Sequence, residues 1–185
     1  VECPCNHELY KEIYWIDEDG VEEPCAAYNP GGPPPHDSDE APRCGLVKVI
    51  LTYCNPNDSE GLVINSFTDQ VPAGLIFEGG SVESIPPGVT GTPAGGFGNL
   101  PIVPAGDCLT ICYKARVTNS ATGTLTGTAS VSAECEGGTV AEPDPATASA
   151  DLLIKIPAMS VAVTQQPGDI CSEPPSNTTT VEFTW

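Results

Sequence analysis

Apolar and polar residues alternate with a period of two along several short segments of this chain, which is typical of half-buried β-strands. Between 46 and 54 one face collects four apolar side chains: Val47, Val49, Leu51 and Tyr53. Between 108 and 118 the corresponding face carries Leu109, Ile111, Tyr113, Ala115 and Val117. Segments 62–67 and 71–77 are shorter candidates. The pattern predicts an all-β fold.

Segment 122–133 has threonine or serine at most alternate positions, with Leu125, Ala129 and Val131 on the opposite face. Such a ladder is typical of a sheet with one solvated face. We expect this segment to pair with the strand at 108–118. Strands at this spacing, with turn residues between them, predict a β-sandwich.

The segments that flank these strands differ in composition. We expect residues 1–45 to form an acidic, Cys- and Pro-rich extension, because the first 44 hold eleven of the 25 acidic residues and 29–35 is Asn-Pro-Gly-Gly-Pro-Pro-Pro. Such a proline run is neither helix nor central strand. Within the extension, aromatic and β-branched residues at 8–16 predict one strand, packed at a sheet edge.

We expect the β-sandwich domain to span 46–135 and a linker to span 136–150, where periodicity is lost and two prolines follow acidic residues. Residues 151–185 are expected to form C-terminal β-strands. In the last of these, three apolar side chains share one face: Val181, Phe183 and Trp185. An apolar strand of this kind needs a host sheet.

Charge narrows the classes of partner. Lys and Arg number 6 against 25 Asp and Glu, a formal net charge of -19, which argues against nucleic acid or an anionic membrane as partner. Leu, Ile, Val and Phe make up roughly a fifth of the chain, enough for one modest core. No stretch of ~18 residues is both uncharged and predominantly apolar, as a membrane span requires, and we expect a secreted protein whose signal peptide has been removed.

The nine cysteines predict an oxidising, extracellular setting, at a cell surface or on an appendage. An odd number leaves at least one thiol that is free or bonded to another chain. We expect at least one interchain disulfide, through one of three cysteines in the tails: Cys3, Cys5 and Cys171. The candidates for bonds within the chain are Cys25, Cys44, Cys54, Cys108, Cys112 and Cys135.

Little in the sequence points to catalysis, and we do not expect an enzyme. The nucleophile elbow, the metal-binding histidine pair and the phosphate loop are all missing from the sequence. Two oxygen-rich loops could hold calcium through Asp17, Asp19, Asp37 and Asp39, but neither continues into the EF-hand spacing, so solvated acidic loops are the favoured interpretation. No other cofactor is expected. Asn57 and Asn177 begin N-glycosylation acceptor patterns.

Five motifs occur in the order found in a known family of repeats. They are Tyr53-Cys54-Asn55, Asp69-Gln70-Val71-Pro72-Ala73-Gly74-Leu75, Pro104-Ala105-Gly106, Ala115-Arg116-Val117-Thr118 and Gly127-Thr128-Ala129-Ser130-Val131-Ser132-Ala133. Over about 46–135 the chain thus resembles the repeat domain of unknown function number eleven, found in bacterial and archaeal surface proteins. The resemblance implies an immunoglobulin-like antiparallel β-sandwich, roles in envelopes, appendages and adhesion, and no catalytic residues.

The resemblance also bears on the cysteines. The topology it implies makes the strands ending at Cys54 and beginning at Cys108 antiparallel neighbours, so that a disulfide between them, with Cα atoms ~5.5 Å apart, is reasonable. Cys112 would then lie on the outer face near Ile50. Because Ile50 is apolar, we expect a cover there, and the Cys-rich extension is the nearest candidate.

The family repeat usually begins with a strand such as Ala-Asp-Leu-x-Ile-x-Lys, which is absent before Leu46 but present at 150–155. Our hypothesis is that the sandwich lacks a strand and that 151–185 supplies one to the next subunit, building an extracellular homopolymer. Three alternatives stay open. The tail could fold back on its own domain, it could be a truncated second repeat, or the chain could be a monomeric cell-surface adhesin or binding module.

Overall fold

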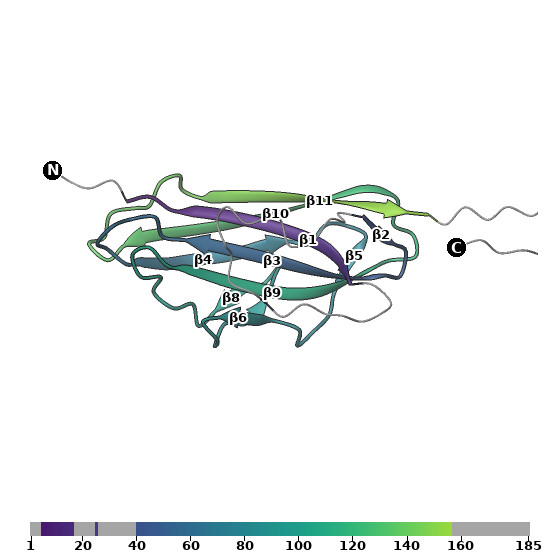
Figure 1. Ribbon diagram of the computed structural model, residues 1–185, viewed down its shortest axis with the longest axis horizontal. Helices are drawn as coiled ribbons and strands as arrows, with labels where there is room; N and C mark the ends of the chain where they lie inside the picture. The colour runs from purple at the N-terminus through teal and green to yellow at the C-terminus, as the bar shows by residue number, and fades with distance from the viewer. Residues whose placement is uncertain (1–4, 17–24, 26–39, 157–185) are drawn as a thin grey trace, which may run out of the picture. The chain divides into compact units, whose positions relative to one another are not determined.

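The computed structural model describes residues 5–16, 25 and 40–156 of the chain. Within these ranges the protein is all-β, and two sheets pack face to face as an immunoglobulin-like β-sandwich (Figure 1). The predicted fold class is therefore confirmed. No helix in the described part of the chain is long and apolar enough to cross a membrane.

The first sheet has the order β1-β3-β9-β5, and β6 also pairs with β9. Its strands are β1 (Glu8–Ile16), β3 (Leu46–Cys54), β5 (Leu75–Phe77), β6 (Glu83–Ile85) and β9 (Cys108–Val117). All its pairings are antiparallel. Two of its long strands, β3 and β9, are those that alternation predicted, because the apolar face of each one lies against the second sheet.

The second sheet has the order β2-β11-β10-β4. Its strands are β2 (Glu40–Pro42), β4 (Leu62–Gln70), β10 (Gly123–Cys135) and β11 (Ala146–Lys155). Only the short β2 runs parallel to its neighbour, β11. A separate two-stranded ribbon is formed by β7 (Thr90–Thr92) and β8 (Gly96–Gly98).

The expected pairing of 108–118 with 122–133 is wrong. Strand β9 pairs with β3, β5 and β6, whereas β10 pairs with β4 and β11 in the other sheet. The connection crosses between the sheets and carries a buried Ala121. Alternation could not reveal this, because an apolar face shows that a strand is half-buried and does not show which sheet contains it.

The structure confirms the edge strand expected at 8–16 and places the start of another strand inside the expected linker. Strand β1, from the predicted extension, pairs with β3 along its whole length and contributes Ile13 to the core. Strand β11 begins at Ala146, inside the predicted linker, and pairs with β10. Its alternation is regular, but three of its inward positions are alanines, which give little hydrophobic signal: Ala146, Ala148 and Ala150.

Candidate functional site

Strand β1 is the element on which the candidate site is built. It forms one edge of the first sheet, with Glu8 opposite Cys54 and Ile16 opposite Leu46. It also lies alongside β11 of the second sheet (Figure 1). Strand β1 therefore closes one side of the sandwich, and three sets of contacts hold it there.

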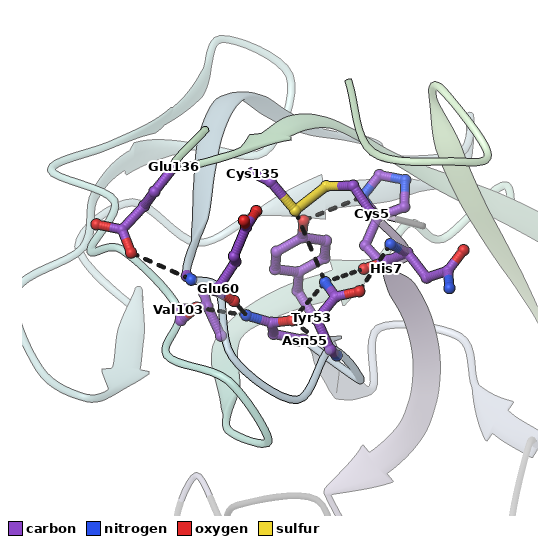
Figure 2. Close-up of a disulfide and its surroundings, with 11 residues drawn as sticks. Cys5, His7, Tyr53, Asn55, Glu60, Val103, Cys135 and Glu136 are labelled. Carbon is purple, nitrogen blue, oxygen red and sulfur yellow. Dashed lines mark hydrogen bonds between the residues drawn. A yellow bond between two sulfur atoms is a disulfide. The ribbon is translucent and has the colours of Figure 1, made fainter. Parts of the chain in front are cut away.

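The first set is a disulfide between Cys5, just before β1, and Cys135 at the end of β10, with Cα atoms 6.0 Å apart (Figure 2). Since β1 and β10 belong to different sheets, this bond joins the two layers. Cys5, one of the three candidates for a bond to another chain, is thus bonded within its own chain, which corrects its candidacy. Backbone contacts explain the pairing, because the Glu142 amide donates to the Cys5 carbonyl at 2.8 Å and brings Cys5 to the second sheet.

His7 adds a buried polar contact beside the disulfide (Figure 2). Its Nε2 lies against the carbonyl oxygen of Pro143, and its Nδ1 is 3.0 Å from the Tyr53 hydroxyl. A carbonyl only accepts, so a neutral His7 carries its proton on Nε2 and accepts from Tyr53 at Nδ1. Burial raises the pKa of Tyr53, which keeps its hydroxyl a donor.

The second set of contacts is made by two asparagines, Asn55 and Asn57, which hold the segment before β1. The buried Asn55 side chain donates to the carbonyls of Glu60 and Val103, both at 2.8 Å, and accepts from the Asn57 side chain at 2.7 Å (Figure 2). The Asn57 side chain also donates to the Asn6 carbonyl at 2.8 Å. The predicted glycosylation acceptor nitrogen of Asn57 is therefore occupied by structural hydrogen bonds.

Two further disulfides among the described residues each involve a cysteine of β9 in the first sheet. Cys54 and Cys108, directly opposite on β3 and β9, are bonded with Cα atoms 4.1 Å apart. This is the pair that the family resemblance implied. Cys112, opposite Ile50 on the outer face, bonds to Cys25, so a residue of the predicted extension does cover that position.

Cys44 differs from its predicted role. It was expected in an intrachain disulfide, yet it is free and exposed. It lies in the turn between β2 and β3 and has a positive φ of 62°. Among the described cysteines only Cys44 is unpaired, because the other six form the three disulfides.

The third set of contacts lies in the core, between the sheets. Lys11 of β1 contacts the Asp69 carboxylate of β4 through Nζ and Oδ1, and both side chains are fully buried. Tyr113 of β9 donates its hydroxyl to the other oxygen, Oδ2, at 2.6 Å. The three residues, hereafter the Lys11–Asp69–Tyr113 cluster, thus connect β1 and β9 of one sheet to β4 of the other.

Burial dominates the electrostatics of this cluster. It lowers the pKa of Lys11, and the nearby Asp69 carboxylate opposes that effect. It raises the pKa of Tyr113, and the negative charge of Asp69 raises it further, so Tyr113 stays a neutral donor. Aromatic rings surround the cluster, with the Phe77 and Phe97 centroids 5.7 Å and 6.5 Å from that of Tyr113.

Sequence reasoning did not identify this cluster. A signal was present, since Lys11 shares an alternating face with Leu9, Ile13 and Trp15 and lies opposite the buried Leu51. A lysine at an inward position of a strand requires a partner in the core. The identity of that partner depends on which strand of the second sheet faces β1, and local patterns do not contain this information.

Several predicted residues lie outside the described residues. They are Cys3, Asp17, Asp19, Asp37, Asp39, Cys171, Asn177, Val181, Phe183 and Trp185. Calcium binding at the acidic loops and strand donation by the tail therefore stay predictions. In the ranges that are described, no group of three or more His, Cys, Asp or Glu side chains could hold a metal ion.

No family model matches the chain, so the resemblance to the repeat family stays a prediction. No curated protein matches it either.

Solved structures give distant matches. The chain is 16% identical to BslA, a bacterial hydrophobin, over 83% of this chain and 99% of that one, with a TM-score of 0.44. It is 14% identical to the pilus backbone protein RrgB of Streptococcus pneumoniae over 71% of this chain and 32% of that one, with a TM-score of 0.43. It is 10% identical to the collagen-binding domain of the Erysipelothrix rhusiopathiae surface protein RspB over 58% of this chain and 41% of that one, with a TM-score of 0.42.

Proposed function

We propose that this chain is a structural subunit of an extracellular filament or cell-surface appendage, in which copies of the chain are joined by β-strand donation and reinforced by disulfides. The three disulfides within one sandwich support a location outside the reducing cytosol. The contacts around β1 support a structural role, because they link the two sheets.

Strand edges that lack a hydrogen-bonded partner carry the proposal, although β1 and β11 lie alongside each other. In the described part of the chain, β1 pairs with β3 on one side only. Strand β11 pairs with β2 only through 153–155, so its outer edge from 146 to 152 has no strand partner among these residues. Edges with unpaired backbone groups accept a further strand, which is the basis of strand addition between chains.

The structure narrows the proposed donor. Residues 151–155, predicted as part of the donated tail, belong to β11 and complete the second sheet of their own chain. We therefore propose as donor the strand expected near 178–185, through Val181, Phe183 and Trp185. An interchain disulfide through Cys3 or Cys171 belongs to the same proposal, since Cys5 is bonded within the chain.

Deleting residues 181–185 tests this proposal by negative-stain electron microscopy of the full chain and the shortened chain. We expect fibres from the full chain and only compact particles from the deletion. A matched control replaces the alternate face, Thr180, Glu182 and Thr184, with serine and should still assemble. Assembly that survives the deletion unchanged would show that this strand is not the connector.

A further inference from the structure

The Lys11–Asp69–Tyr113 cluster is not explained by subunit assembly, because it lies entirely inside one sandwich. It holds a primary amine against a carboxyl group where both side chains have no exposed surface. We propose that Lys11 and Asp69 react with each other to form an intramolecular amide bond, which covalently joins strand β1 to strand β4 and thereby one sheet to the other.

The positions of the groups favour this reaction. The Lys11 amine contacts Oδ1 of Asp69, while Tyr113 holds Oδ2 at 2.6 Å. The backbone amide of Asp69 also donates to the Pro93 carbonyl at 2.9 Å, which fixes the position of the backbone at Asp69. Holding two reactants in contact removes most of the entropic cost of a bimolecular step.

The environment favours the reactive forms of both groups. An ion pair removed from water bears a large desolvation penalty, so a proton transfer from the ammonium to the carboxylate, which yields a neutral amine and a neutral acid, is promoted by burial. The lowered pKa of Lys11 agrees with this direction. The space around the amine is also confined, since a Cβ built on Gly127 would lie 2.7 Å from Lys11 Nζ.

The reaction is a condensation and needs no oxidant. The lone pair of Lys11 Nζ attacks Cγ of Asp69 and forms the C–N bond, and the Cγ–Oδ1 bond then breaks. The departing hydroxyl leaves as water with a proton from the amine nitrogen. Negative charge that develops on Oδ2 during the attack is stabilised by the Tyr113 hydroxyl, which already donates to that atom.

Such a bond would complement the Cys5–Cys135 disulfide. Lys11 lies in the middle of β1 and Asp69 near the end of β4, so the amide would fasten β1 at a second point along its length. Unlike the disulfide, it would not be broken by reducing agents. Strand β1 would stay joined to the second sheet in either redox state.

Intact-mass spectrometry of the full chain, reduced and denatured, tests the proposal. We expect the wild-type mass to be lower than the sequence mass by one water molecule, and Lys11→Arg to restore the full mass. Lys48→Arg is a matched control, because Lys48 is also buried but its position on β3 alternates with the core-facing Val47 and Val49. It should keep the deficit. A wild-type chain at its full sequence mass overturns the proposal.

Tryptic mapping of the reduced, alkylated wild-type protein locates the bond without relying on any variant. An amide at Lys11 blocks cleavage there, so the peptide of residues 1–43 should be recovered joined to that of residues 49–114. Recovery of the free peptide 1–11, or a water deficit confined to a single peptide, contradicts the assignment. Tyr113→Phe should lower the cross-linked fraction, because the donor to Oδ2 is then lost.

Discussion

At the scale of single residues, the buried Lys11–Asp69 contact between the sheets and the exposed Arg116–Glu78 ion pair should contribute very differently to stability. Lys11–Asp69 is fully buried, whereas the side chains of Arg116 and Glu78, 2.8 Å apart, are 52% and 40% exposed. Asp69→Ala leaves a buried lysine without its partner, and we expect a loss of about 3–5 kcal/mol in the free energy of unfolding. Glu78→Ala should cost no more than about 1 kcal/mol. Denaturant titration of both variants measures the difference, and equal losses would contradict this account.

A second prediction for single residues concerns how the two buried tyrosines make stability depend on pH. Burial raises the pKa of both Tyr53 and Tyr113. Above the ordinary tyrosine pKa of about 10, the folded state therefore holds more protons on these phenols than the unfolded state does, and the free energy of unfolding should fall as the pH rises.

Phenolate absorbance recorded beside the unfolding signal checks this behaviour. At least two of the five tyrosines should ionise only as the chain unfolds, and Tyr113→Phe should reduce that number by one. Ionisation of all five near pH 10 in a chain that is still folded would contradict the burial of these side chains.

At the scale of elements, strand β1 depends on its covalent anchor. The Cys5–Cys135 disulfide spans a sequence separation of 130 residues, and removal of a native bond of this kind costs about 2–5 kcal/mol. We expect the double variant Cys5→Ser, Cys135→Ser to lose stability in this range. Amide hydrogen exchange should rise most at the N-terminal end of β1, which is closest to the lost bond.

Cys44→Ser is the control for that experiment, because Cys44 is free and exposed. A surface substitution away from structural features should change the free energy of unfolding by no more than about 0.5 kcal/mol. If the double variant leaves the amides of β1 as protected as in the wild type, the disulfide is not what anchors the strand.

The strands also show which parts of the fold can be predicted from local sequence patterns. Alternation located β3 and β9 because their inward residues are large and apolar. It did not locate the start of β11, because the inward residues there are alanines, which give little hydrophobic signal. The partners of β10 and the Lys11–Asp69 contact depend on which strands face each other across the sandwich, and that is a property of the whole topology.

At the scale of the whole molecule, covalent bonds compensate for a modest core. Among the described residues, two disulfides connect β9 and β10 to segments that precede β2, and a third joins the neighbouring strands β3 and β9. The charge is distributed unevenly, since the region from 110 to 133 contains no acidic residue although the net charge is -19. A net charge this far from zero opposes unspecific association of subunits, which favours contacts through defined strand edges.

Negative-stain electron microscopy of the purified full chain over a series of concentrations tests the central claim most directly. If subunits are joined by strand donation, the images should show fibres of uniform width whose number grows with concentration. Compact single particles at every concentration would contradict the proposal and indicate a monomeric surface module instead.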